Sequence, residues 1–184
     1  MIMAPWAAAA LLAATGIAPL AFRVPGGDWA TPAASVDLAP ERRRAIEAAV
    51  DRALEKNDQG CFFYALVDLN GDGADELLVQ ARGPEACGSQ GCPLLFFRWK
   101  EQRLVQISRT GLVRNVGVTP WKGKGPRPLI VATWGGEYRE LRAKGGRYPK
   151  DAYARSVRVV KEISPDVKQV PWIAAASCSE DEAR

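Results

Sequence analysis

Residues 61–81 read CFFYALVDLNGDGADELLVQA, and this stretch decides how the rest of the chain is interpreted. Two apolar runs of strand length, 61–67 and 76–81, flank a short connection rich in acidic residues and glycine. A connection this short places consecutive strands side by side in opposite directions. The pattern therefore predicts an antiparallel β-hairpin whose turn carries polar side chains.

The turn has the ligand spacing of a calcium loop. Counted from Asp68, oxygen-bearing side chains stand at positions 1, 3, 5 and 9, and Gly73 at position 6 permits a sharp turn. Calcium takes about six to eight oxygen ligands, and a chain that winds around the ion presents alternate side chains inward. The sequence thus predicts Ca²⁺ as a cofactor. The predicted ligands are the side chains of Asp68, Asn70, Asp72 and Glu76 and the carbonyl oxygen of Ala74.

Two alternatives to this loop make different demands on the sequence. An EF-hand needs a bidentate Glu at position 12, where this chain has Val79, and it needs a preceding helix, where this chain has a strand pattern. Without that ligand the expected dissociation constant is on the order of 10⁻⁴ to 10⁻³ M, the range of extracellular modules. The second alternative is a metal-free Asn-Gly and Asp-Gly turn, which does not require oxygen ligands at strict alternate spacing.

The motif resembles a known class of calcium loops. Asp68-Leu69-Asn70-Gly71-Asp72-Gly73, followed by an acidic residue and an apolar strand, is similar to the loop of FG-GAP and VCBS repeat proteins, such as the blades of integrin-type propellers. The longer stretch 61–99, with CGSQGC at 87–92, resembles a group of small bacterial periplasmic proteins. The resemblance implies an ion held between two strands of a blade-like sheet. It does not imply a propeller, which needs several blades, because this chain has one such loop.

The remainder of the chain predicts an α+β fold. We expect mainly an antiparallel β meander, like the sheet of a propeller blade, preceded by one amphipathic helix that begins near Pro40. The apolar stripe of this helix consists of Ile46, Ala49, Val50, Ala53 and Leu54. The predicted strands are 61–67, 76–81, 93–99, 103–108, 129–134 and 137–142. The segment 116–128 is predicted to be a basic surface loop.

The four cysteines favour disulfide bonds over a zinc site. Cys87 and Cys92 bracket a short glycine-flanked loop that a disulfide can close, which leaves Cys61 and Cys178 to pair with each other. In the alternative, a four-cysteine zinc site, the ligand pairs would have a two-residue spacing that neither pair shows. An even number of cysteines is typical of proteins from an oxidising compartment.

The N-terminal residues predict export. Residues 1–22 carry no charged side chain and contain a short apolar run, which suits a signal peptide or an uncleaved N-terminal anchor. Residues 23–39 are rich in Pro, Gly, Ala and Thr and read as a linker, and 40–184 as a single calcium-binding, β-rich domain. We therefore expect a periplasmic or secreted protein that meets a membrane only through an uncleaved N-terminus.

The composition excludes the commonest kinds of catalytic site. The chain has 184 residues, 47% of them hydrophobic, and no histidine, so it can build neither a Ser-His-Asp site nor a His-ligated metal centre. The acidic side chains of the loop are better explained as calcium ligands than as a general acid and base. We therefore expect a protein that is not an enzyme; the alternative is a hydrolase that uses a carboxylate-bound metal.

The second half of the chain predicts the kind of partner. Basic side chains outnumber acidic ones over residues 98–168, with aromatic residues interleaved. They are Arg98, Lys100, Arg103, Lys122, Lys124, Arg127, Arg139, Arg142, Lys144 and Arg147, with Trp99, Trp121, Trp134 and Tyr138 between them. This pattern fits either a stacking platform for nucleic acid or a sheet with one buried aromatic face and one wet cationic face. We favour the second interpretation, because exported proteins seldom meet nucleic acid.

The predicted function is that of an exported, non-catalytic calcium-binding protein that binds another macromolecule of the cell envelope, either a protein or an anionic polymer. An alternative is a periplasmic inhibitor or immunity protein against a cell-wall hydrolase, by analogy of fold and compartment with inhibitors of that kind. In that case an exposed loop would enter the cleft of the target. The loops that we consider for this role are 82–90, 121–127 and 135–139.

Overall fold

The computed structural model describes residues 38–54, 61–82, 86–101, 103–120, 125–170 and 172–174. The predicted signal segment 1–22, all but the last two residues of the predicted linker 23–39, and Cys178 lie outside these residues. No described helix combines the length and the apolar character needed to cross a membrane. The described part of the chain forms one α-helix and two antiparallel sheets, which confirms the α+β class.

Helix α1 (Pro40–Ala53) begins where the sequence predicts. Proline suits the first turn because its φ is already helical and its missing N–H would have no partner there. Ile46, Ala49 and Val50 are buried and form the apolar stripe. The neighbouring Arg42 and Arg44 are exposed, so the arginine run at the start of the helix lies largely in solvent, as expected of a polar face.

The first sheet contains the predicted hairpin. Its strands β1 and β2 pair in register from Phe62 opposite Ala81 to Val67 opposite Glu76, so the last pair closes the base of the acidic loop. β3 and β4 continue the meander in the same antiparallel sense. In spatial order the strands are β10 (Ile173–Ala174), β1 (Phe62–Val67), β2 (Glu76–Ala81), β3 (Cys92–Lys100) and β4 (Arg103–Val113).

A second sheet follows directly, and here the expectation of one meander is too simple. The chain leaves β4 at Val113 and enters the second sheet at Asn115, where the next strand begins. In spatial order the strands are β8 (Arg158–Val160), β7 (Tyr138–Leu141), β6 (Leu129–Ala132), β5 (Asn115–Val118) and β9 (Lys168–Gln169). The prediction of a surface loop over 116–128 is wrong for 116–118. Gly117 masks the strand pattern, but it pairs with Ile130 on one side and Gln169 on the other.

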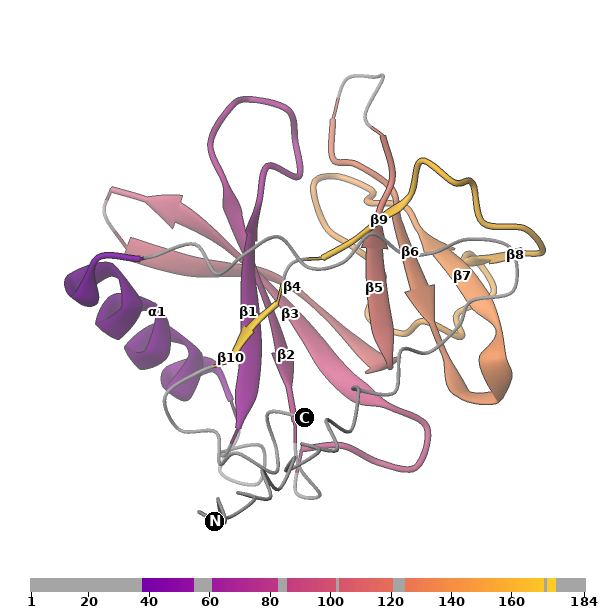
Figure 1. Cartoon of the computed structure of the whole chain (residues 1–184), viewed down its shortest axis with the longest axis horizontal. Helices are drawn as coiled ribbons and strands as arrows, with labels where there is room; N and C mark the ends of the chain where they lie inside the picture. The colour runs from indigo at the N-terminus through magenta and orange to yellow at the C-terminus, as the bar shows by residue number, and fades with distance from the viewer. Residues whose placement is uncertain are drawn as a thin grey trace, which may run out of the picture.

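The elements form three layers. Figure 1 shows α1 on one side of the first sheet and the second sheet on the other. Along β1, Phe62 and Tyr64 pack with the helix, whereas Ala65 packs with the second sheet. Strand β2 is buried along its whole length for the same reason. A sheet covered on both faces needs continuous apolar runs, which explains why residues 61–81 show little alternation.

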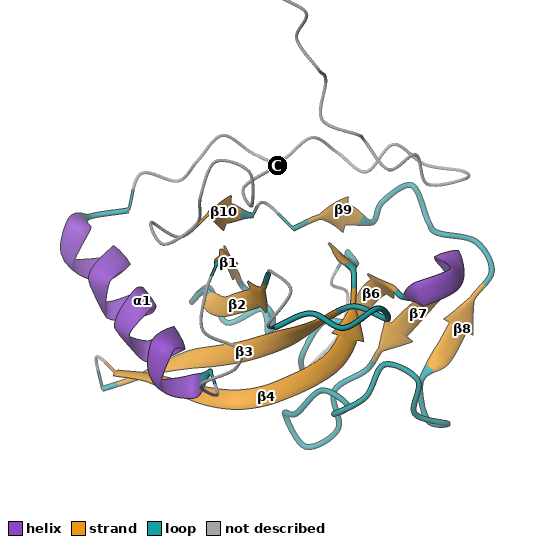
Figure 2. Cartoon of the chain, turned by 90° about the horizontal axis from the view of Figure 1, so that it is seen from below, coloured by secondary structure: helices purple, strands orange, loops and turns teal. Residues whose placement is uncertain are grey.

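Residues 168–174 contribute a strand to each sheet. β9 pairs with β5 through Val118 opposite Lys168, and β10 pairs with β1 through Tyr64 opposite Ile173. Figure 2 shows the two short strands in line along one side of the molecule. This segment therefore bridges the two sheets by backbone pairing.

The Cys87–Cys92 disulfide is present, with the two Cα atoms 4.2 Å apart. Inside the loop that it closes, Gly88 and Gly91 exchange backbone hydrogen bonds of 3.1 Å. Cys61 is also disulfide-bonded, while its predicted partner Cys178 lies outside the described residues. Because Cys87 and Cys92 are bonded to each other, the four-cysteine zinc site is excluded.

Candidate functional site

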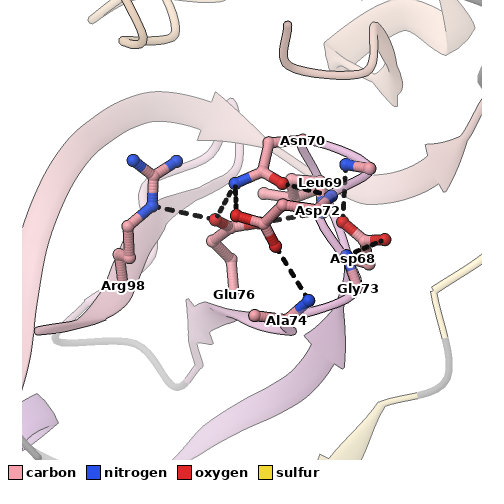
Figure 3. A network of polar contacts seen from close by, with 9 residues as sticks. Asp68, Leu69, Asn70, Asp72, Gly73, Ala74, Glu76 and Arg98 are labelled. Atoms are coloured by element: carbon pink, nitrogen blue, oxygen red, sulfur yellow. Dashed lines mark hydrogen bonds and ion pairs between the residues drawn. The ribbon is translucent and has the colours of Figure 1, made fainter.

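The acidic loop between β1 and β2 is closed by its own side chains (Figure 3). Asp68 accepts hydrogen bonds from the backbone amides of Gly71 and Gly73, at 2.6 and 3.2 Å. Asn70 Oδ1 accepts from the amide of Asp72, and Asp72 Oδ1 accepts from the amide two residues further on, both at 2.8 Å. Asn70 and Asp72 thus fold back over the turn, because a short Asx side chain reaches the amide two residues ahead, and Asp68 reaches the amides three and five residues ahead.

Glu76 holds the loop to the sheet. Its carboxylate is buried at the start of β2 and accepts three hydrogen bonds (Figure 3). The amide of Leu69 donates to Oε2 at 2.9 Å, while Asn70 Nδ2 and Arg98 Nε donate to Oε1 at 2.8 and 2.9 Å. The charge of Glu76 is therefore paired and hydrogen-bonded, as a buried carboxylate requires.

The charge of Asp68 is stabilised in the folded protein. Desolvation raises the pKa of this carboxyl, but the hydrogen bonds from Gly71 and Gly73 and the nearby charge of Arg127 lower it by more, so the pKa lies below its ordinary value. The ionised form contributes stability above the unfolded pKa of about 4. That contribution is lost as the pH falls through the lower pKa of the folded state.

The loop also contacts the second sheet. Leu69 is buried in the cluster between the two sheets, and its carbonyl accepts a hydrogen bond of 2.5 Å from the amide of Arg127. Arg127 lies just before β6, so this bond joins the turn of the first sheet to the second sheet. A change in the conformation of the acidic loop would therefore reach the contact between the sheets.

The chemistry of the loop suits a calcium ion. Asn70 Nδ2 donates to Asp72 Oδ2 and to Glu76 Oε1, both at 2.8 Å, so this donor stands between two carboxylates. A cation would attract the same oxygens, and all the predicted ligands offer the hard oxygen atoms that calcium prefers. Within the described residues no three Asp, Glu or Cys side chains are grouped to hold a metal, so an ion here would also need amide and carbonyl oxygens.

The structure brings most of the predicted ligands together. Asp68, Asn70, Asp72 and Glu76 all belong to the hydrogen-bond network of the loop, and Asp75 is exposed. Ala74 enters the network through its amide, which donates to Asp72. Sequence spacing did not identify Arg98, the ion-pair partner of Glu76, because it lies on another strand and belongs to no local motif.

A basic cleft lies along β4, and none of its lining residues belongs to the acidic loop. Its volume is about 990 Å³, and five of the residues that line it are cationic: Arg109, Arg142, Lys144, Arg147 and Lys150. Its other polar side chains come from Gln106, Ser108 and Ser156, and none of the lining residues is acidic. A hairpin turn at Gly145 and Gly146 carries Lys144 and Arg147, whose backbones are joined by hydrogen bonds of 2.9 and 3.2 Å.

Only some of the predicted basic residues share this cleft. Arg142, Lys144 and Arg147 line it, although Arg142 is paired with Glu140 at 2.9 Å. Arg98 pairs with Glu76, Arg139 pairs with Glu137, and Lys122 and Lys124 lie outside the described residues. Three of the predicted basic residues therefore share the cleft with Arg109 and Lys150, and the others lie elsewhere or outside the described residues.

The described aromatic residues that a stacking platform would need lie in different parts of the fold. Trp99 packs against the cluster beneath α1, Tyr138 is buried in a cluster of the second sheet, and Trp134 is exposed in the turn after β6. Trp121 lies outside the described residues. Neighbouring residues of a strand point to opposite faces, so interleaving in the sequence does not bring side chains together in space.

Two of the three loops considered for partner binding border one cleft. Arg82 and Gly88 from the loop 82–90 and Gly136 from the loop 135–139 line a hollow of about 540 Å³, together with the adjoining Gly91 and Trp134. This hollow is called the tryptophan cleft below. The described residues of the third loop, 125–127, are not among its lining residues.

Comparison of the chain with protein-family models, curated proteins and solved structures finds no match. The resemblance to FG-GAP and VCBS loops therefore rests on the loop residues themselves and stays a prediction.

Proposed function

We propose that this chain is an exported, non-catalytic calcium-binding protein that binds an anionic macromolecule of the cell envelope in the basic cleft. The observation that carries the proposal is the lining of that cleft, which combines five cationic side chains with no acidic one. The partner is an acidic protein surface or an anionic envelope polymer.

The electrostatics of the cleft support this choice of partner. Cationic side chains that converge on a concave surface raise the local concentration of anions and speed their association. Guanidinium groups of Arg109, Arg142 and Arg147 match the planar geometry of carboxylates and the tetrahedral face of phosphates through paired N–H donors. Affinity in such a cleft should fall as salt is added, because the contacts are partly exposed.

The calcium part of the proposal rests on the acidic loop. Asp68, Asn70, Asp72 and Glu76 would hold the ion with their side chains, and Ala74 with its carbonyl. The carboxylates of Asp72 and Glu76 already accept hydrogen bonds from Asn70 Nδ2, and the ion would supply a positive charge to the same group of oxygens. The loop joins two antiparallel strands, which is the arrangement that the FG-GAP resemblance implies. We include in this proposal that the first sheet is similar to the sheet of a propeller blade.

The proposed absence of catalysis is supported by how the carboxylates of the loop are used. Asp68 and Asp72 accept hydrogen bonds from backbone amides, and Glu76 accepts three donors including Arg98. Although desolvation raises it, the pKa of Asp68 lies below its ordinary value because of these backbone hydrogen bonds and the nearby Arg127, whereas a general acid must hold a proton near neutral pH. If the purified protein turned over a cell-wall substrate, and Asp72→Ala abolished this activity, the protein would be an enzyme that uses the acidic loop.

Calcium should stabilise the protein, and Asp72→Asn should remove most of this effect. The asparagine keeps an oxygen for the Ala74 amide but loses the charge that attracts the ion. At calcium concentrations about ten times the dissociation constant, the wild type should gain about 1.4 kcal/mol. Thermal denaturation with calcium and with chelator measures the gain.

The matched control for the calcium experiment is Asp75→Asn, which removes the same charge from an exposed residue of the same loop. It should leave the calcium effect nearly intact. If calcium stabilises the Asp72→Asn variant as much as the wild type, Asp72 is not a ligand. A flat calorimetric titration of the metal-stripped protein with millimolar calcium would remove the calcium proposal altogether.

Charge reversal in the basic cleft should abolish polyanion binding. Poly-L-glutamate and polyphosphate are suitable probes, and the double variant Arg147→Glu/Lys150→Glu should bind either at least about tenfold more weakly than the wild type. The control Lys161→Glu/Lys168→Glu makes the same change of net charge at exposed residues that do not line the cleft. Equal losses in the two double variants would mean that net charge, and not the cleft, binds the polymer.

A further inference from the structure

The tryptophan cleft lies where the chain passes from β4 to β5, and Arg114 joins its two walls. One wall is the loop closed by the Cys87–Cys92 disulfide, and the other is the single 3₁₀ turn Trp134–Gly136 after β6. The Arg114 guanidinium lies 4.7 Å from the centroid of the Trp134 ring and donates to the carbonyl of Ser89 at 3.2 Å. The Arg114 side chain is thereby held between the Trp134 ring and the Ser89 carbonyl.

Both walls are held in place by contacts of the protein itself. Gln80, buried in β2, donates to the carbonyls of Val113 and Arg114 at 3.0 and 3.1 Å and so holds the corner between β4 and β5. Thr133 donates its amide and its hydroxyl to the carbonyl of Glu137, which closes the turn that carries Trp134. A cleft whose walls are already ordered loses little conformational entropy when it binds.

Two arginines and no acidic residue are among the described residues that line the cleft. Arg82 is the second cation. Its guanidinium lies 5.1 Å from the centroid of the Phe63 ring, and its Nε is buried without a hydrogen-bond partner in the described part of the chain. Burial lowers the pKa of Arg82, which reflects the cost of holding this charge away from water. An anion bound in the cleft would reduce that cost.

Trp134 adds an apolar surface beside the two cations. It is 54% exposed, more than any other large hydrophobic residue in the described part of the chain. Trp and Arg are the residues most enriched in binding hot spots, where a few side chains contribute most of the affinity. The glycines of the walls leave room for a partner backbone, since a Cβ at Gly88 or Gly135 would have no neighbour within 4 Å.

We propose that the tryptophan cleft is a second binding site, which takes an acidic segment of a partner polypeptide. An Asp or Glu carboxylate lies between Arg82 and Arg114, and a neighbouring apolar side chain packs on Trp134. A phosphate or uronate polymer would be matched by a longer row of cations, as in the basic cleft, whereas two guanidinium groups and one ring fit a single acidic residue with an apolar neighbour. This site uses no residue of the basic cleft.

The test follows the Trp134 indole N–H signal by NMR in the uniformly ¹⁵N-labelled full chain, with the signal assigned by Trp134→Phe. The probe is the blocked peptide Ac-Ala-Phe-Glu-Phe-Ala-NH₂, and its glutamine counterpart is the control. The glutamate peptide should shift the indole signal saturably at concentrations up to about 10 mM. The glutamine peptide should bind roughly tenfold more weakly, because a charged hydrogen-bonding partner is lost.

Variants of the cleft separate binding from folding. Arg82→Gln should weaken the glutamate peptide roughly tenfold. Gly88→Val should abolish binding by filling the cleft, since its side chain points into open space and its backbone has no positive φ. The Arg147→Glu/Lys150→Glu variant should bind the peptide at Trp134 as the wild type does, so failure of the basic-cleft proposal would leave this result unchanged.

Four outcomes would overturn the proposal. The first two are the absence of a saturable shift with the glutamate peptide, and binding of the glutamine peptide as tight as that of the glutamate peptide. The third is full binding of the glutamate peptide by a folded Gly88→Val variant. The fourth is a shift of the indole signal with inorganic phosphate as large as the shift with the glutamate peptide. The last outcome would identify a general anion site in place of a site for acidic polypeptides.

Discussion

Tyr148→Ala is expected to lower the free energy of unfolding by about 4 kcal/mol, as the loss of a buried aromatic side chain usually does. Tyr148 is 4% exposed and stacks on Phe96 of the first sheet, with ring centroids 4.4 Å apart. Its hydroxyl donates to the carbonyl of Arg127 at 2.7 Å, just before the second sheet's β6. The variant would therefore leave a cavity in the cluster between the two sheets.

Tyr148→Phe is the control that separates the ring from its hydroxyl. Burial raises the pKa of Tyr148 well above its ordinary value, so the hydroxyl remains a donor throughout the usual pH range. Loss of that single hydrogen bond should cost about 1 kcal/mol. Urea denaturation followed by circular dichroism measures both variants. A loss below about 1.5 kcal/mol for Tyr148→Ala would contradict the central packing role of the ring.

Glu76→Ala should cost about 3 kcal/mol, because it leaves buried donors without an acceptor. The amide of Leu69 and Arg98 Nε lose their acceptor, and Asn70 Nδ2 keeps only its bond to Asp72. Most of the cost should come from the loop donors, since the Arg98 side chain is 45% exposed and can be solvated by water. Denaturation in the presence of chelator isolates this effect from any contribution of calcium.

Arg98→Ala is the matched control for Glu76→Ala. A partly exposed ion pair contributes at most about 1 kcal/mol, and the loop amides would still hold the Glu76 carboxylate. If Arg98→Ala destabilises the protein as much as Glu76→Ala, the ion pair and not the anchoring of the loop determines the stability of this region.

The local parts of the fold could be predicted from the sequence. Pro40 and the stripe through Ile46 and Val50 indicate α1, and the apolar runs around the acidic loop indicate the β1–β2 hairpin, because both signals lie within a short window. The second sheet was missed as a separate sheet. Strands such as β5 and β8 are too short to show a period, and their pairing depends on partners far along the chain.

In the candidate site too, local features could be predicted from the sequence, whereas contacts between distant residues could not. The spacing of Asp68, Asn70 and Asp72 predicts a polar turn, and in the structure these side chains accept hydrogen bonds from backbone amides of the loop. By contrast, no spacing rule connects Arg98 to Glu76 or Arg114 to Trp134, because each pair is brought together by strand order and by the corner between the sheets. The identity of a bound ion is likewise not a property of spacing alone.

Pairing of 168–174 with both sheets has a consequence for folding during synthesis. Until these residues emerge from the ribosome, β1 and β5 each lack their outer neighbour, so both sheets present an open edge. Unpaired edges of this kind invite association with other chains. The nascent protein should therefore depend on holding chaperones late in translation, and truncations before Lys168 should aggregate although most of the core sequence is intact.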